Sequence, residues 1–230
     1  MEREVKNKKL LKATNNFEDI CNSKNFKFKY LDDWLYTKSK ILKKETHSNK
    51  QKEYRFYPRG TIVYAKLGVN IGSEFSGNHF CIVLNKNDHK RSELITVVPL
   101  TSKKTKISIR LPENILGHAI EKMEKDSLSL SHDFAKIKKM HKTSVDTGII
   151  EPELETELDL IEKNYVELRK IIDRYGRFKG KHTYAIPSQV ITISKKRISI
   201  INKYDPTGHI SFNSTTLKKI EEYMQVNLFV

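Results

Sequence analysis

The chain has 230 residues, a formal net charge of +15 at pH 7 and an apolar fraction of 37%. Its 10 Tyr, 10 Phe and one Trp argue against a wholly disordered chain. Two cysteines are too few for a disulfide framework or a four-cysteine zinc site. No apolar run reaches the roughly 20 residues that span a bilayer, and the first twenty residues lack a signal-peptide core. We therefore expect a cytoplasmic protein with no membrane contact.

The excess of 43 Lys and Arg over 28 Asp and Glu points to a polyanionic partner. Nucleic acid, an acidic protein and an anionic membrane surface all satisfy this charge. Lys outnumbers Arg, which suits attraction to phosphate better than bidentate reading of bases. The alternative is a soluble Lys-rich protein whose composition reflects an AT-rich genome.

Residues 1–52 are polar and basic, and we interpret them as an N-terminal helical extension. Apolar residues recur at helical spacing over about 28–44. Asp32 and Asp33 lie near the start of this helix, and Lys43 and Lys44 lie near its end, which suits the helix dipole. The polar stretch that follows, 46–53, is predicted to be a linker.

Residues 53–112 have the pattern of short strands separated by turns. A loop at 68–78 contains three glycines, and the strands are predicted at 61–67, 79–85, 94–100 and 107–111. The second and third are nearly continuous apolar runs, which is typical of strands buried on both faces. Close spacing of short strands favours a small antiparallel barrel.

Residues 113–180 interrupt the strand pattern. Apolar residues recur every three or four positions in two runs, which Asp146, Thr147 and Gly148 separate. An antiparallel helical hairpin is the simplest interpretation. Residues 181–230 are predicted to complete the barrel, with strands at 182–187, 188–193 and 198–201, and to end in a helix within 211–229. Asn213, Ser214 or Thr215 can cap that helix.

Motifs of the predicted strands occur in a recognisable order. They are Arg59-Gly60, Gly72-Ser73-Glu74, Gly77, Ile82-Val83-Leu84 and Pro99-Leu100-Thr101-Ser102, followed by Gln189, Thr192, Ile193 and Arg197. In this order they resemble the MazF/PemK family of type II toxin-antitoxin systems, and the closing helix also fits. The resemblance covers about half of the chain, whereas 1–52 and 113–180 lie outside the compact family core.

The resemblance implies an α+β fold, built on a small antiparallel Src-homology-type β-barrel with a C-terminal helix. It also implies a metal-independent, sequence-selective endoribonuclease toxin that acts on single-stranded RNA and mRNA. The products would carry 2′,3′-cyclic phosphate and 5′-hydroxyl ends. We expect no cofactor, a homodimer and a cognate antitoxin protein as partner.

The sequence departs from the family where catalysis is concerned. The Arg usually found at the start of the second strand is His79 here, and Phe80 replaces the Pro that follows it, whereas Thr101 is retained. A second set of catalytic residues, known in the plasmid-borne branch, is absent: those positions read Ser73, Ile186 and Ser188.

RNA cleavage without a metal needs a base for the 2′-hydroxyl, an acid for the leaving 5′-oxygen and donors for the phosphorane. Histidine titrates near 6.5 and suits proton transfer better than arginine. We therefore predict His79 as general base or acid, with the hydroxyls of Thr101 and Ser102 on the phosphate. The alternative is that His79 is an ordinary loop residue in a family member that has lost its arginine.

The remaining candidates would bind the substrate. They are Ser73 and Glu74 in the glycine-rich loop, Lys103 after the third strand, and Gln189 and Arg197 in the later motif. Glu74 can accept from a base or cap the loop's own amides, and Gln189 can read a base edge or hold the loop. Two basic clusters are candidates for phosphate contacts: Lys103, Lys104 and Lys106, and Lys195, Lys196 and Arg197.

Tyr64 and Phe75 are candidates for base stacking, although Tyr64 also suits a core position. Cys81 is predicted to be a small buried hydrophobe. His132 and His141 are too far apart to form a helical metal-binding pair. Two functions compete with the nuclease on the same barrel: a non-catalytic RNA-binding regulator, and a gyrase-poisoning toxin such as CcdB.

Overall fold

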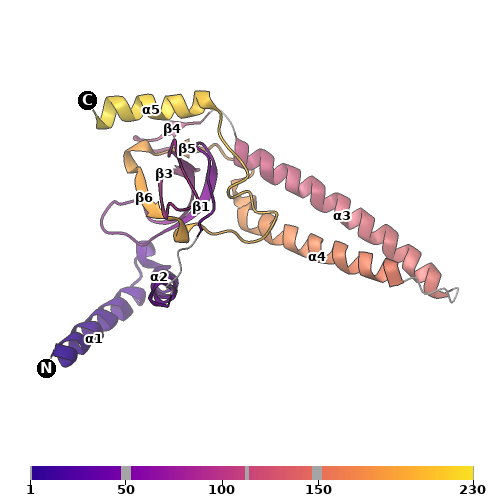
Figure 1. The fold of residues 1–230 in the computed structure, drawn as a ribbon, viewed down its shortest axis with the longest axis horizontal. Coiled ribbons are helices and arrows are strands. Elements are labelled where there is room, and N and C mark those ends of the chain that lie inside the picture. Colours follow the sequence, from indigo (N-terminus) through magenta and orange to yellow (C-terminus); the bar gives the residue numbers. More distant parts are fainter. Residues whose placement is uncertain (1, 48–52, 112–113, 147–151, 230) are drawn as a thin grey trace.

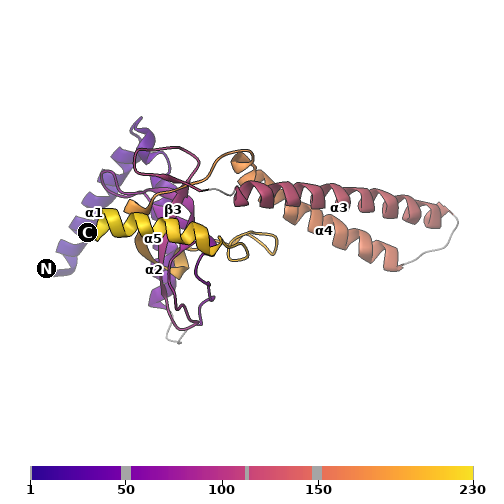
Figure 2. The same ribbon diagram turned by 90° about the horizontal axis from the view of Figure 1, so that it is seen from above.

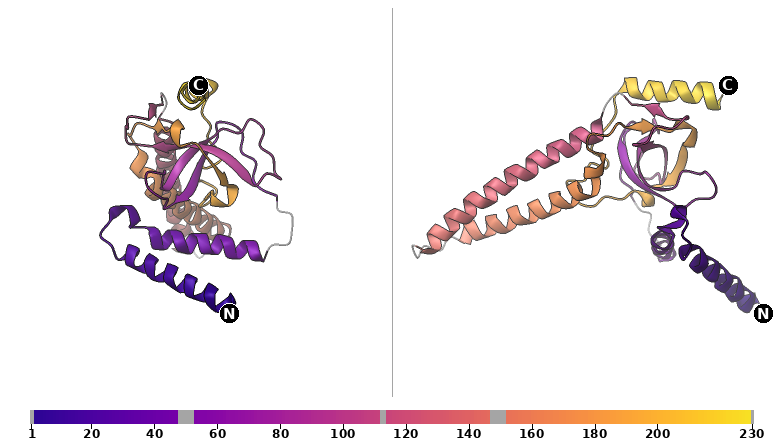
Figure 3. Two further views of the ribbon diagram at one scale, coloured as in Figure 1. Left: turned by 90° about the vertical axis from the view of Figure 1, so that its left-hand side faces the viewer. Right: turned by 180° about the vertical axis from the view of Figure 1, so that it is seen from behind.

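A computed structural model describes residues 2–47, 53–111, 114–146 and 152–229. A curved antiparallel sheet forms the body, and a long pair of helices projects from it as an arm (Figure 1). The N-terminal helices and the C-terminal helix lie on opposite sides of the sheet (Figure 3). The predicted α+β class is confirmed. Among the described residues, no helix is both long enough and apolar enough to cross a membrane.

The sheet depends on one bent strand, β3 (Leu94–Thr101). Its first half pairs with β6 (Ile191–Ser194), and its last two residues pair with β5 (Tyr184–Ala185). On its other side β3 pairs with β2 (Gly77–Val83), which in turn pairs with β1 (Ile62–Gly68). The two-residue strand β4 (Ile109–Arg110) pairs with β5 at the far edge. Every pairing is antiparallel.

The strand pairings do not close the sheet into the predicted barrel. The chain after β6 returns to β1 through separate contacts: an isolated bridge between Ala65 and Ile198, and backbone hydrogen bonds of Ile62 with Gly208 and Ile210. Two 3₁₀ turns accompany the gap: the first replaces backbone that we had predicted to be extended, and the second lies between two predicted strands. Turn η3 (Pro187–Gln189) shortens the predicted strand 188–193, and turn η4 (Lys195–Arg197) leaves only that bridge from the predicted strand 198–201.

Alternation along β1 and β2 creates two apolar clusters on opposite faces of the sheet. One includes Tyr64 and Phe80 and is covered by the C-terminal helix α5 (Ser214–Leu228) and the base of the arm. The other includes Val63 and Cys81, whose predicted burial is confirmed. Asn213 caps α5, since its side-chain oxygen accepts a 2.8 Å hydrogen bond from the amide of Thr216.

The N-terminal extension contains two helices, α1 (Glu2–Cys21) and α2 (Leu31–Thr46), joined by the turn η1 (Phe26–Phe28). Helix α2 confirms the predicted helix at 28–44. We did not predict α1, because its few apolar residues are exposed and form no clear stripe. Helix α2 packs on the end of β1: a Cβ added at Gly68, whose φ is +88°, would lie 2.2 Å from Trp34 Cε2.

The predicted helical hairpin is confirmed as α3 (Ile115–Asp146) and α4 (Pro152–Tyr175). The helices lie side by side and leave the body of the protein together (Figure 2). Residues Thr147 and Gly148 of the predicted turn lie outside the described residues. Four rings fix the base of the arm to the sheet: Tyr175 and Phe178 pack within 5.4 Å, centroid to centroid, of Tyr64 or Phe80.

A buried ion pair joins η4 to the loop after β2. Lys195 Nζ lies 2.7 Å from Asp88 Oδ1, and the two side chains are 3% and 1% exposed. The ammonium also donates to the carbonyls of Arg55 and His89, while Asp88 accepts from the amide of Tyr57. Lys195 therefore holds three segments together and is not available as a surface phosphate contact.

Replacing Lys195 with Met should leave the Asp88 carboxylate buried without its counter-charge. We expect the free energy of unfolding to fall by roughly 3–5 kcal/mol. The matched control is Lys90→Met, because Lys90 and its partner Glu53 are 69% and 79% exposed, and exposed pairs contribute less than about 1 kcal/mol. Urea denaturation measures both, and equal losses in the two variants would contradict the structural role of Lys195.

Candidate functional site

His79 lies on β2 beside the end of β3. The pairing of β2 with β3 ends at Cys81 and Pro99, two residues before the positions of His79 and Thr101. At this point the imidazole Nδ1 lies 3.0 Å from the carbonyl oxygen of Leu100. Because a carbonyl only accepts, Nδ1 carries the hydrogen and Nε2 of the neutral ring carries the lone pair. The neutral ring therefore presents Nε2 as its basic atom.

The surroundings of His79 favour the neutral imidazole. Burial lowers the pKa of His79 below its usual value, carbonyls of Leu100 and Ser76 partly offset this, and the charge of Arg177 lowers it further. The Phe75 ring covers the imidazole, with the two centroids 4.4 Å apart. At neutral pH this residue is therefore ready to take up a proton rather than to release one.

The loop between β1 and β2 is held by its own hydrogen bonds. Asn70 Nδ2 donates to the carbonyl of Phe75, and the amide of Asn70 donates to Ser76 Oγ. Lys27 in the N-terminal extension donates to the carbonyl of Gly72 at 2.6 Å. Ser73 and Glu74 are exposed at the tip of this loop, so the structure places both side chains toward solvent.

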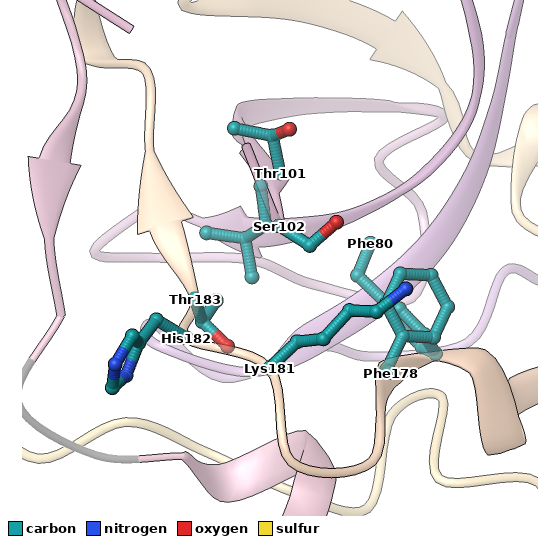
Figure 4. Close-up of a pocket in the computed structure, with 8 residues that line it drawn as sticks. Phe80, Thr101, Ser102, Phe178, Lys181, His182 and Thr183 are labelled. Atoms are coloured by element: carbon teal, nitrogen blue, oxygen red, sulfur yellow. The ribbon is translucent and has the colours of Figure 1, made fainter. Parts of the chain in front are cut away.

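A small pocket opens at the end of β3 (Figure 4). Thr101 and Ser102 form one wall, and the segment that leaves the arm, Lys181–Thr183, forms the opposite wall, with Phe80, Leu100 and Phe178 as its apolar lining. Thr101 Oγ1 accepts a 3.1 Å hydrogen bond from the amide of Lys103. His79 is not among the residues that line the pocket; its contact is with the carbonyl of Leu100, which lines the pocket beside Thr101.

Sequence reasoning missed the far wall of the pocket. Lys181 and His182 were interpreted only as the approach to a strand. His182 ring nitrogens lie 3.1 Å from Nη2 of Arg110, which precedes the arm in the sequence. The run from Lys179 to His182, with three cations or titratable groups in four residues, was a signal available in the sequence. Only the return of the arm to β5 shows that this run faces Thr101 and Ser102.

Two predicted substrate contacts lie away from this pocket. Arg197 donates to the carbonyl of Leu67 at 3.2 Å and lies over the ring of Trp34, with 5.3 Å from its Cζ to the ring centroid. Gln189 ends the turn η3, and its amide donates to the carbonyl of Ile186. Arg197 therefore links β1 to α2, and neither residue is among those lining the pocket.

The basic clusters also separate. Lys196 forms ion pairs with Glu93 at 2.8 Å and Glu45 at 2.9 Å. The hydrogen bond to Glu93 is the main reason that the pKa of Lys196 is raised. With Lys195 buried and Lys196 paired, the second cluster is mainly structural. The first cluster is exposed beyond Thr101 and remains suited to phosphate: Lys103, Lys104 and Lys106.

The two candidate stacking rings are both occupied within the fold. Tyr64 is buried, as its core alternative predicted, and Phe75 packs on His79.

In the part of the chain that the structure describes, no three His, Cys, Asp or Glu side chains gather in a way that could hold a metal ion.

Comparison with known families supports the resemblance. Residues 58–151 match the family described as the PemK-like, MazF-like toxin of type II toxin-antitoxin systems. The match begins before β1 and covers β1–β4 together with α3, which we had placed outside the family core; it ends before the later motif that contains Gln189 and Arg197. No curated protein matches the chain.

The lowered pKa of His79 predicts a dependence of stability on pH. The unfolded residue takes up its proton near pH 6.5, whereas the folded one does so at lower pH. Below about pH 6.5 the unfolded chain therefore binds more protons, and the free energy of unfolding falls as the pH falls. His79→Asn, which keeps a donor for Leu100, should flatten this dependence in urea titrations.

The same shift can be observed directly by NMR titration of the imidazole groups. The signal of His79 should titrate at lower pH than that of histidine in an unstructured peptide, which titrates near pH 6.5. A midpoint at or above that of the peptide would contradict the burial of His79.

Proposed function

We propose that the chain is an endoribonuclease toxin, because residues 58–151 match the PemK-like, MazF-like toxin family. It would cleave single-stranded RNA, including mRNA, without a metal ion. The observation that carries this proposal is the contact of His79 Nδ1 with the carbonyl of Leu100, the residue before Thr101, inside the matched segment. This arrangement sets a neutral imidazole beside a pocket that has hydroxyl and ammonium donors.

The proposed reaction begins at the 2′-hydroxyl of the substrate. His79 Nε2 takes the proton, the 2′-oxygen attacks the adjacent phosphorus, and the bond from phosphorus to the 5′-oxygen breaks. The imidazolium then returns its proton to the departing 5′-oxygen, so the products carry a 2′,3′-cyclic phosphate and a 5′-hydroxyl. No proton or electron is left unaccounted for, and one residue serves as base and then as acid.

The pocket would bind the phosphate that reacts. Ser102 and Thr101 supply hydroxyls, and Lys181 supplies a positive charge in the same pocket. Donors already fixed by the fold stabilise charge on the phosphorane without reorganising. The exposed cluster of Lys103, Lys104 and Lys106 would hold the phosphates beyond the cleavage point, and Ser73 and Glu74 at the loop tip would contact a neighbouring base.

The partners follow from the same proposal. The substrate is single-stranded RNA, and the protein would work in the cytoplasm as a homodimer that a separate antitoxin protein inhibits. Gln189 lies beside β3, and Arg197 lies between β1 and α2. We propose that Gln189 orders the end of β3 and that Arg197 acts on RNA only through the position of α2.

Replacing His79 with Ala should abolish cleavage of a long unstructured RNA in the presence of EDTA. General acid–base catalysis contributes about 10²–10⁴-fold, so we expect a loss of that size in the rate at saturating RNA. The matched control is His118→Ala, since His118 is exposed on α3 and lies away from the pocket. Mapping of the cut ends shows whether they carry cyclic phosphate.

Unchanged cleavage by His79→Ala would exclude the imidazole as the base. No cleavage by the unaltered protein, with RNA binding retained, would identify a non-catalytic RNA-binding regulator. A DNA gyrase supercoiling assay run alongside tests the remaining alternative, because inhibition there without RNA cleavage would indicate a gyrase poison.

A further inference from the structure

A second concave site lies on the other side of the aromatic residues that line the Thr101 pocket. We name it the α2 cleft, because it runs between α2, the ends of β1 and β2, and the end of α4. Its volume is about 530 Å³, within the roughly 300–1,000 Å³ of sites that bind small molecules. The proposed chemistry does not use this cleft, although Gly77 of the family motif and Tyr64 are among the residues that line it.

Three cations line the α2 cleft: Lys66 on β1, Arg174 on α4 and Arg177 in the turn η2 (Gly176–Phe178) that follows α4. Within the described ranges, no ion pair joins any of them to a carboxylate. Asp33 is the acidic residue among the lining residues. The cleft therefore retains a positive charge, whereas Lys195 and Lys196 nearby on η4 are neutralised by Asp and Glu.

Aromatic rings lie among these cations. Trp34 and Tyr64 already have guanidinium partners, since Arg197 and Arg174 lie 5.3 and 5.1 Å from their ring centroids. Tyr30 and Tyr36 are 59% and 64% exposed, and their cationic partners are the lysines Lys29 and Lys40, 5.2 and 5.0 Å from the ring centroids. Large aromatic rings at the edge of a positively charged groove are the platform on which proteins stack unpaired bases.

We propose that the α2 cleft binds an unpaired nucleotide segment of RNA. Bases stack on Tyr30 and Tyr36, and phosphates contact Lys66, Arg174 and Arg177. The inference rests on the proposed function for the identity of the strand, because the strand that occupies the cleft is the one cut at the pocket. The turn η2 connects the two sites: Arg177 lines the cleft, and the next residue, Phe178, lines the pocket.

Beside the ends of β1 and β2, the cleft is built by parts of the chain beyond the matched family segment. Tyr30 and Tyr36 come from the N-terminal extension, and both arginines come from the second helix of the arm and the turn after it. In this proposal the N-terminal extension and the arm share one role: both lengthen the RNA-binding surface beyond the cleavage point.

The test measures binding without cleavage. The probe is a short fluorescein-labelled single-stranded RNA with 2′-O-methyl groups throughout, which cannot be cut because its 2′-oxygens cannot attack. Fluorescence anisotropy gives the dissociation constant of the full chain over a range of salt concentrations. The variants are Tyr36→Ala and the double variant Arg174→Ala with Arg177→Ala. The control is Arg169→Ala, an arginine on α4 that pairs with Asp173.

Tyr36→Ala should weaken binding about fivefold or more, because stacking of one base on an aromatic ring is worth about 1–3 kcal/mol. The double arginine variant should make the dependence of log K on log salt shallower by about 1.4, since each phosphate contact with a single strand contributes about 0.7. Arg169→Ala should change neither value. The three arginine side chains and Tyr36 are all exposed. Thermal unfolding checks that each variant is folded.

Wild-type affinity in both cleft variants would overturn the proposal. So would equal displacement of the probe by a polyglutamate peptide of the same charge, since the cleft would then recognise acidic protein rather than nucleotides. This binding test does not depend on catalysis. Absence of cut ends with native RNA would refute the proposed nuclease. Weaker binding of the probe by the cleft variants would still show that the α2 cleft binds RNA.

Discussion

The aromatic cluster at the base of the arm determines where both candidate sites lie. Tyr64 and Phe80 come from neighbouring strands, and Tyr175 packs against both rings at the end of α4. The hydroxyl of Tyr175 donates to the buried carboxylate of Asp205, so the ring cannot turn away without losing this hydrogen bond. Phe80 also lines the Thr101 pocket, and Tyr64 also lines the α2 cleft. One packed group of rings therefore separates the two sites and orients them.

The sequence predicted the elements whose apolar residues repeat regularly. The strands β1 to β3, the helical hairpin and α5 are all visible as repeats of two or of three to four residues. It could not predict the open sheet, because the turns η3 and η4 depend on Pro187 and on the buried Lys195–Asp88 pair, which is a contact between distant segments. Charge counting likewise treated Lys195 and Lys196 as surface residues, since the carboxylates that neutralise them are remote in the chain.

The candidate site was predictable in part for a similar reason. His79, Thr101 and Ser102 follow from motifs on consecutive strands. Lys181 and His182 do not, because about eighty residues of chain separate them from Thr101 and only the antiparallel return of the arm brings them back. Residues contributed by an insertion carry no motif of the core, so the structure is needed to find them.

The arm begins and ends at two strands of the sheet that pair with each other. Strand β4 precedes it, β5 follows it, and the amide of Leu111 donates to the carbonyl of Thr183 just outside their pairing. The two ends of the insertion are thus tied together by the body of the protein, and the cost of closing a longer loop grows only slowly with its length. The arm can therefore be lengthened or trimmed by matched helical turns without altering the register beneath it. This makes the arm, at the end far from the sheet, a suitable place for grafting a foreign peptide onto the protein.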